Sequence, residues 1–393
     1  MKAAGIVAEY NPFHTGHAYH IAETRRRLGA DTGVICVQSG NWVQRGECAL
    51  TDKWTRAAMA LRGGADLILE LPLPWAISSA EGFAQGAVAV LKATGVVDSL
   101  SFGSESGNLE GIYQVAKALE TDVFQNVLLE ELDKGNSFAE ARQRAVLRIA
   151  GGAGSILSGA NDNLGVEYLR AAGKKFAAMA IPRQGVVHDS ARPAEGFASA
   201  SYLRGLAREQ KWKEMSSWMG QEDLKDLKEA GVSDMSYVER AVLAQLRRMG
   251  EREFAALPDS GFAEGLPARL ARAARSAGSL EEFYALAKTK RYAHSRIRRL
   301  VLWAFLNMTE NDRPRQPSYL RVLGFNARGQ ELLKEMKTTA ALPVLTKPAH
   351  IREFSVEAQR LFALECRATD LFGLCFEIPK PAGLDLVTTP IFQ

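Results

Sequence analysis

The chain contains little cysteine, and its four cysteines, Cys36, Cys48, Cys366 and Cys375, are widely spaced. None of them forms a Cys-x-x-Cys motif or lies near a pair of histidines, so a zinc site and a disulfide framework are both disfavoured. We expect the four thiols to be reduced and to serve as structural residues. Reduced thiols indicate the cytoplasm as the compartment.

Long hydrophobic runs are absent as well. No segment approaches the roughly 18 consecutive apolar residues that a membrane-spanning helix needs, so we expect no membrane partner. The apolar run near the N-terminus ends at Glu9 after a few positions, which is too short for the apolar core of a signal peptide. Ala3–Ala8 is instead typical of a first buried strand.

No residue class is strongly depleted and neither sign of charge dominates. Hydrophobic residues make up 47% and charged residues 24% of the 393 positions, which is ordinary globular usage and excludes a disordered, collagen-like or coiled-coil chain. This length predicts two or three domains. The formal charge is −2 over residues 1–200 and +6 over residues 201–393, so we expect the second part to bind any polyanionic partner.

Short apolar runs alternate with helical patterns through the first 181 residues. Such alternation predicts a Rossmann-like α/β fold, in which a parallel sheet has helices on both faces and ligands bind beyond the carboxyl ends of the strands. Residues 108–150 are helical and acidic, and the glycine-rich residues 151–154 mark a break. The expected strands are Ala3–Ala8, Val34–Val37, Asp66–Leu71, Val97–Phe102 and Phe176–Ile181, and the expected helices are His17–Leu28, Lys53–Arg62, Glu81–Lys92 and Asn163–Ala172.

Beyond Leu203 the sequence is mostly helical. We therefore predict two domains, an α/β domain over residues 1–208 and a mostly helical, basic domain over residues 209–393. A short strand is expected at Tyr319–Leu323. The expected helices are Tyr237–Met249, Leu266–Ala277, Leu280–Ala287, Ser295–Phe305, Gly329–Met336 and Val356–Leu371.

The strongest motif follows the first strand and reads Glu9-Tyr10-Asn11-Pro12-Phe13-His14-Thr15-Gly16-His17. Pro12 helps to end the strand, and Gly16 lets the backbone approach a ligand closely. His14 and His17 can donate hydrogen bonds to phosphate oxygens, together with the N–H groups of the helix that begins here. His20, one turn further on, is expected on the helix surface.

His14–His17 resembles the His-x-Gly-His motif of the nucleotidyltransferase superfamily, whose members bind ATP and react at its α-phosphate. A second segment, Phe197-Ala198-Ser199-Ala200-Ser201-Tyr202-Leu203-Arg204, is similar to the Ile-Ser-Ser-Thr-x-x-Arg motif of the small-molecule adenylyltransferases. At a helix start, Ser199, Ser201 and the backbone N–H groups can bind the β- and γ-phosphates, while Arg204 neutralises the departing pyrophosphate.

Several longer stretches resemble one family within this superfamily, the bacterial tRNA(Met) cytidine acetate ligases. The likeness runs from the first residues past Arg204 and touches the basic segment near Arg296. Thr15 stands where the family commonly has asparagine, and Ala160 stands where it commonly has proline. The stretches are Ser39–Glu47, Asp52–Ala57, Gly64–Pro72, Ser101–Glu105, Asn161–Tyr168, Ile181–Gly185, Lys290–Arg299 and Leu323–Phe325.

The resemblance implies an enzyme that forms acetyl-adenylate from ATP and acetate, and then acetylates N4 of the wobble cytidine (position 34) of elongator tRNA(Met). AMP and pyrophosphate are released. Mg²⁺ can accompany ATP, although no carboxylate cluster in the sequence requires a metal. The resemblance assigns catalysis to His14, His17, Ser199, Ser201 and Arg204, and ATP contacts to Val7, Ala8, Glu9, Tyr10, Asn11, Pro12, Phe13, His14, Thr15, Gly16, His17, His20, Gly103, Asn161, Arg183 and Gln184.

Three of these positions also make physical sense by themselves. Gly103 ends a strand at its carboxyl end, where the lack of a side chain admits an adenine or a ribose. Asn161, or Asn163 if the register is shifted, can hydrogen-bond the base or ribose, or can cap the following helix. Arg183 follows a strand and can hold phosphate or acetate.

Other polar residues near these motifs have weaker claims to function. Arg45 and Lys53 are further cations near the site, with no role assigned to them. His188 and Asp189 are adjacent in sequence, and we interpret them as a loop hydrogen bond rather than a catalytic dyad.

A basic segment of the second half is the candidate RNA-binding surface. Its cations fall within little more than three helical turns without an acidic residue among them, so a polyanion would relieve their repulsion. Leu300, Leu302, Trp303 and Leu306 can bury the opposite face, and Tyr292 can stack a base. The cations are Lys288, Lys290, Arg291, Arg296, Arg298 and Arg299.

Two other functions stay open at this point. One is adenylyl transfer to a small molecule or acetate activation for a carrier-protein thiol, as in citrate lyase ligase, although a small acceptor does not need an extended cationic surface. The other is non-catalytic RNA binding, in which the two histidines have no chemical role.

Overall fold

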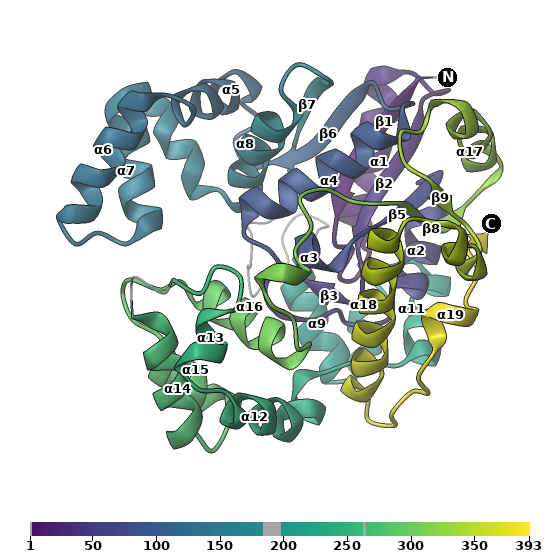
Figure 1. Cartoon of the computed structure of the whole chain (residues 1–393). Helices are drawn as coiled ribbons and strands as arrows, with labels where there is room; N and C mark the ends of the chain where they lie inside the picture. Colours follow the sequence, from purple (N-terminus) through teal and green to yellow (C-terminus); the bar gives the residue numbers. More distant parts are fainter. Residues whose placement is uncertain (1, 184–197, 262–264) are drawn as a thin grey trace.

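A computed structural model describes residues 2–183, 198–261 and 265–393 (Figure 1). Its main sheet has the strand order β10-β8-β5-β2-β1-β6-β7, with β9 paired to β8. The five strands from the first half, which run in parallel, confirm the predicted α/β fold. They are β1 (Ala3–Ala8), β2 (Gly33–Ser39), β5 (Leu67–Leu71), β6 (Ser99–Ser104) and β7 (Ala177–Pro182).

Helices cover both faces of this sheet, which explains why its strands are apolar without alternation. In β2, Val34 and Cys36 belong to one buried apolar cluster, while Ile35 and Val37 belong to the other. The first cluster includes side chains of α1 (Thr15–Leu28) and α2 (Lys53–Arg62), and the second includes those of α4 (Ala80–Thr94) and α8 (Ala160–Ala172).

Helix boundaries follow their capping residues. Helix α2 has the predicted bounds because the side chain of Asp52 accepts hydrogen bonds from the N–H groups of Trp54 and Thr55. Helix α1 begins at Thr15, two residues before the predicted start, because the side chain of His14 caps it by accepting from Gly16 N.

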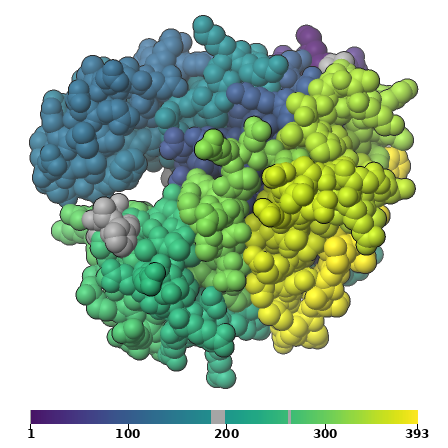
Figure 2. Space-filling view, viewed as in Figure 1, coloured from purple at the N-terminus to yellow at the C-terminus, as the bar shows by residue number. Residues whose placement is uncertain are grey.

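The acidic stretch after β6 forms three helices, α5 (Leu109–Ala118), α6 (Asp122–Asp133) and α7 (Phe138–Ala150). The glycine-rich run that follows is a 3₁₀ helix, Gly151–Ser158, rather than an open break. In the space-filling view the surface is hollowed between the blue α5–α7 and the green region that contains α13–α15 (Figure 2).

The described residues between 200 and 306 are mostly helical, as predicted. The chain then returns to the sheet with β8 (Leu320–Phe325), which pairs antiparallel with β5. Strands β9 (Val344–Leu345) and β10 (Ile391–Phe392) add to β8. The division at residue 208 stays a prediction, and the sheet contains strands from both sides of it. The helices of the second half are α9 (Ala200–Arg208), α10 (Trp212–Met215), α11 (Gln221–Ala230), α12 (Glu239–Arg248), α13 (Glu251–Ala255), α14 (Leu266–Ser276), α15 (Leu280–Ala287), α16 (His294–Phe305), α17 (Ala327–Thr339), α18 (Val356–Phe372) and α19 (Leu384–Val387).

A buried ionic cluster attaches the C-terminal segment to the sheet. Lys53 Nζ lies 2.7 Å from Glu70 Oε1 and 2.8 Å from Asp385 Oδ1, and Arg321 Nη1 lies 2.5 Å from Asp385 Oδ1. These residues come from α2, β5, β8 and α19. Lys53 is fully buried in this cluster, so the expectation that it lies near the nucleotide site is wrong.

Within residues 2–183, 198–261 and 265–393, no helix is both long and apolar enough to span a bilayer. The four cysteines are free thiols, and all but Cys366 are buried.

Candidate active site

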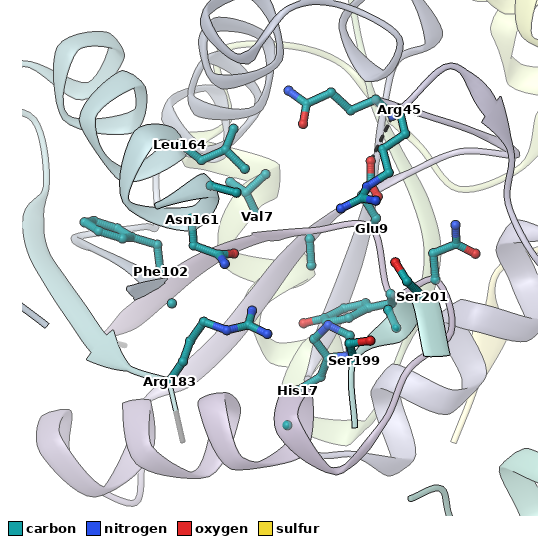
Figure 3. A pocket seen from close by; sticks show the side chains of 18 of the residues that line it. Val7, Glu9, His17, Arg45, Phe102, Asn161, Leu164, Arg183, Ser199 and Ser201 are labelled. Carbon is teal, nitrogen blue, oxygen red and sulfur yellow. Dashed lines mark hydrogen bonds between the residues drawn. The ribbon is translucent and has the colours of Figure 1, made fainter. Parts of the chain in front are cut away.

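A cavity of about 710 Å³ opens at the carboxyl ends of β1, β6 and β7 (Figure 3). Its walls also include the start of α1, the start of α8, the start of α9 and one side of α16. This is the position at which parallel α/β sheets bind ligands, because strand ends and helix N-termini meet there. The cavity therefore joins both sequence motifs to the basic segment.

His14 and His17 stand together at the start of α1, with ring centroids 3.9 Å apart. His14 Nδ1 accepts the 3.0 Å hydrogen bond from Gly16 N, which leaves its N–H on Nε2. His17 Nδ1 is buried and has no hydrogen-bond partner within the part of the chain that the structure describes. A buried polar atom without a partner is costly, so the geometry suits a bound ligand that supplies one.

Burial keeps the histidines of the cavity neutral. Removal from water lowers the pKa of His14 to about 3, and the positive charge of Arg183 adds to the effect. The same two causes lower the pKa of His20 to about 4. The pKa of His17 is lowered well below its ordinary value, by burial and then by His14 and Arg183. Near neutral pH these imidazoles can therefore donate hydrogen bonds without carrying charge.

The second motif meets the first at Arg204. Arg204 Nη1 donates to Asn11 O over 2.9 Å, and Nη2 donates to Ser201 Oγ over 3.0 Å. Ser199 caps α9 by accepting from Tyr202 N. Ser199, Ser201 and Arg204 all line the cavity, so the two motifs lie at one site, as predicted. The contact of each side chain with phosphate stays a prediction.

Most of the other predicted ATP contacts also line the cavity. Three of them do not, namely Pro12, Phe13 and Thr15. Phe13 is buried in an apolar cluster, and Thr15 is exposed and donates its N–H to Trp218 O. Gln184, with His188 and Asp189, lies outside the described residues. The predicted residues that do line the cavity are Val7, Ala8, Glu9, Tyr10, Asn11, His14, Gly16, His17, His20, Gly103, Asn161 and Arg183.

His20 does not lie on the outer surface of α1, so that expectation is wrong. Its Nε2 lies 3.0 Å from Ser101 Oγ on β6, and the ring lines the cavity. Residues three apart lie on the same side of an α-helix, so the side chains of His17 and His20 both lie on the face of α1 that meets the sheet.

Asn161 and Asn163 both line the cavity. The carboxylate of Glu105 accepts hydrogen bonds from Asn161 N and Nδ2 over 3.0 and 2.6 Å. Asn163 Oδ1 accepts from Arg142 Nη1. The residue before α8 is Gly159, which provides no side-chain cap, so Asn161 does not act as the cap residue. A nucleotide contact by Asn161 or by Asn163 stays a prediction.

The basic segment reaches the cavity through α16. Arg298 and Arg299 line the cavity, whereas Lys288, Lys290 and Arg291 precede the helix and are exposed. The six cations therefore do not share one helix, because α16 begins only at His294. Trp303 and Tyr292 are buried, which confirms the core role of Trp303 and removes Tyr292 as an open stacking surface.

A two-stranded hairpin connects α16 with the motif loop. It consists of β3 (Trp42–Val43) and β4 (Glu47–Cys48). Its turn lies against α16, since a Cβ on Gly46 would fall 2.6 Å from backbone atoms of Arg298 and Arg299. Glu47 lies 3.6 Å from both Arg204 and Arg298.

Sequence reasoning missed several wall residues of the cavity. Phe102, Leu164 and Tyr168 form an apolar wall, and His294 and Ser295 contribute from α16. These residues carry no motif of their own. Only the pairing of distant elements brings them to the cavity, so no local signal could have found them.

Among the residues that the structure describes, no three His, Cys, Asp or Glu side chains are grouped so that they could hold a metal ion. That Mg²⁺ enters with ATP therefore stays a prediction.

A parallel sheet whose first strand leads into a His-x-Gly-His turn, over a cavity lined by arginines and serine hydroxyls, defines a nucleotidyltransferase of the HIGH type. Residues 1–383 match the model of the family described as HIGH Nucleotidyl Transferase. The chain belongs to this family and, within it, to the tRNA(Met) cytidine acetate ligases.

The relatives that support this assignment match nearly the whole chain. The tRNA(Met) cytidine acetate ligase of Caldanaerobacter subterraneus subsp. tengcongensis is 36% identical over 96% of this chain and 96% of its own. The crystal structure of apo Thermotoga maritima TmcAL is 35% identical and matches with a TM-score of 0.94 over 100% of this chain and 99% of that one. The same protein bound with alpha-thio ATP matches with a TM-score of 0.90.

Proposed function

We propose that this chain is an ATP-dependent ligase that acetylates N4 of the wobble cytidine of elongator tRNA(Met). The observation that carries the proposal is that one cavity gathers both nucleotidyltransferase motifs and two arginines of the basic segment. The names of the relatives, tRNA(Met) cytidine acetate ligases in each case, supply the acceptor. We assign the reaction to the cytoplasm, where ATP and tRNA meet.

The first step activates acetate. An acetate oxygen attacks the α-phosphorus of ATP, the bond to the β-phosphate oxygen breaks, and acetyl-adenylate and pyrophosphate form. His14, His17 and the N–H groups that start α1 stabilise charge on the phosphate oxygens. Arg204, with Ser199 and Ser201, holds the pyrophosphate. Transfer of this kind depends on positioning and electrostatics rather than on a protein nucleophile.

The adenine and ribose are proposed to occupy the side of the cavity near Gly103, Asn161 and Arg183. Phe102 and Leu164 on this side offer an apolar surface to the base. If Mg²⁺ accompanies ATP, it neutralises phosphate charge.

The second step transfers the acetyl group to RNA. The cytidine, extruded from the anticodon loop, presents its exocyclic amine to the acetyl carbon, and AMP leaves. Exposed Lys288, Lys290 and Arg291 would contact phosphates of the anticodon arm, with Arg296, Arg298 and Arg299 closer to the reacting base.

The alternatives predict different products. Transfer to a small molecule or to a carrier-protein thiol leaves tRNA unmodified, and a non-catalytic RNA-binding protein consumes no ATP. The basic segment at the cavity favours RNA as the acceptor over a small molecule, because Arg298 and Arg299 belong to both.

The deciding experiment incubates the protein with ATP, ¹³C-labelled acetate and total tRNA, digests the RNA, and analyses the nucleosides by mass spectrometry. Labelled N4-acetylcytidine in tRNA(Met), dependent on both ATP and acetate, is the expected result. ATP consumption without a labelled nucleoside would instead indicate another acceptor.

A further inference from the structure

The wall of the cavity is strongly cationic and contains one carboxylate. Among the described residues that line the cavity, Glu9 is the only acidic one. It shares the cavity with Arg45, Arg183, Arg204, Arg298 and Arg299. A carboxylate repels a triphosphate bound in the same cavity. The ATP contact that the resemblance assigns to Glu9 therefore does not account for its side chain, which calls for a different chemical role.

The fold holds Glu9 at a defined place. It is the first residue after β1, and its backbone O accepts a hydrogen bond of 2.5 Å from Arg56 Nη1. Its Oε1 accepts a hydrogen bond of 2.8 Å from Gln44 N in the turn of the β3–β4 hairpin. Gln44 O in turn accepts from Arg299 Nη1 over 3.4 Å, so two hydrogen bonds lead from the carboxylate to the basic helix α16.

Glu9 therefore lies on the RNA side of the cavity. In Figure 3, Glu9 and Arg45 lie to the right, while Phe102, Asn161 and Arg183, the proposed nucleotide side, lie to the left. His17 and Ser199 lie lower and between the two groups, and Ser201 lies below Glu9. Under the proposed function, an acceptor base that enters past Arg298 and Arg299 would meet Glu9 beside the residues assigned to the phosphates.

The chemistry of the acceptor requires a base at this place. The exocyclic amine of cytidine is a weak nucleophile because its lone pair is delocalised into the ring, and it becomes strongly acidic as it bonds to the acetyl carbon. We propose that Glu9 is the general base of acetyl transfer, an inference that rests on the proposed function. The C–N bond forms, the proton of the amine passes to the Glu9 carboxylate, and the acyl C–O bond breaks with its electron pair leaving on AMP.

The surroundings of Glu9 suit a proton acceptor. Burial raises the pKa of Glu9 above its ordinary value, against the lowering effects of the Gln44 hydrogen bond and of Arg204 and Arg45. Glu47 on the hairpin also raises it. The other ionisable groups around Glu9 are Arg56 and Tyr168. A carboxylate with a raised pKa is a stronger base than a free one.

The test separates the two half-reactions in Glu9→Gln. The amide oxygen of glutamine can still accept from Gln44 N, so the fold should be retained, as a thermal melt would verify. We expect acetate-dependent exchange between ATP and labelled pyrophosphate to stay within about threefold of wild type. Transfer from chemically prepared acetyl-adenylate to tRNA(Met) should fall by about 10²–10⁴-fold. The pH dependence gives a second readout, because wild-type transfer should slow as the pH falls through the pKa of Glu9, and this limb should be missing in the variant.

Glu47→Gln is the matched control. It removes one negative charge beside Arg204 but no cavity carboxylate, so its effects on exchange and on transfer should be similar in size. Equal losses of both half-reactions in Glu9→Gln would overturn the proposal and make Glu9 a residue of the ATP site. Undiminished transfer in the variant would also overturn it. If the wild type shows neither exchange nor transfer, it is the proposed function that fails.

Discussion

The guanidinium of Arg204 donates a hydrogen bond of 2.9 Å to the backbone carbonyl of Asn11, 193 positions earlier in the chain. This bond joins the loop that carries His14 and His17 to the helix that carries Ser199 and Ser201. Each motif alone is a common local structure. Because the two motifs meet at one cavity, their histidines, serines and arginine can bind the same nucleoside triphosphate.

Arg204→Lys tests the role of the guanidinium. Lysine keeps the charge but cannot hold Asn11 O, Ser201 Oγ and a phosphate at the same time, because it lacks the planar fork. We expect acetate-dependent ATP–pyrophosphate exchange to fall about 10–100-fold. Arg208→Lys is the matched control, since Arg208 lies on the same helix, pairs with Asp234 and does not line the cavity. Similar losses in the two variants would argue against a phosphate contact.

His17→Gln tests the imidazole with the unpartnered nitrogen. Loss of a preorganised donor to a phosphate oxygen should reduce the exchange rate about 10²–10³-fold. The exposed His350 provides the control His350→Gln, which should exchange at the wild-type rate. An unchanged rate in His17→Gln would remove this histidine from the mechanism.

The buried histidines predict a loss of stability in mild acid. Their pKa values in the folded protein are below the ordinary 6.5, at about 3 for His14 and about 4 for His20. The unfolded chain therefore takes up more protons as the pH falls below about 6.5, and the free energy of unfolding decreases. Between about pH 6.5 and 5 most carboxylates are still ionised in both states, so the histidines should dominate this part of the curve.

Urea unfolding at several pH values measures this effect, and His20→Gln should show a smaller decrease than wild type over the same window. NMR signals of the His14 ring that titrate near pH 6.5 in the folded protein would contradict the prediction.

Lys290→Ala/Arg291→Ala tests the exposed part of the basic segment. Both side chains precede α16 and lie outside the cavity wall. Removing two phosphate contacts should raise the KM for tRNA(Met) and reduce the slope of log affinity against log salt by about 2. Exchange in the absence of tRNA should keep its wild-type rate. A control with the exposed pair Lys334→Ala/Lys337→Ala on α17 should leave the salt slope unchanged.

Asp385→Asn tests the buried ionic cluster that attaches the C-terminal segment. The substitution leaves Lys53 and Arg321 with Glu70 as their remaining close carboxylate, so the free energy of unfolding should fall by about 3–5 kcal/mol. The exposed pair Glu140–Arg144 offers the comparison Glu140→Gln, which should cost less than about 1 kcal/mol. Equal effects of the two substitutions in chemical unfolding would contradict the role of the cluster.

The sequence predicts the parallel half of the sheet because its strands are short, apolar and separated by amphipathic helices. Ala3–Ala8 and Lys53–Arg62 have the predicted bounds. The sequence does not predict that Leu320–Phe325 pairs antiparallel with β5, because the residues of a short strand do not identify the strand with which it pairs. It also predicts that Lys53 lies near the nucleotide. In the structure Lys53 is instead buried beside Asp385, which is more than 300 residues away in sequence.

The candidate site is predicted where its residues belong to a motif, as for His14, His17 and Arg204. It is not predicted where a residue reaches the cavity from a distant element, as Tyr168 and His294 do. Helical periodicity alone misjudged His20, because the face of α1 that it occupies meets β6 rather than solvent.

The most direct measurement is a crystal structure with a non-hydrolysable ATP analogue. We expect the α-phosphate to lie within hydrogen-bonding distance of His14 or His17, with the β- and γ-phosphates against Arg204 and the start of α9. An analogue bound outside this cavity, or bound in it with its phosphates turned away from both histidines, would contradict the proposed role of the two histidines.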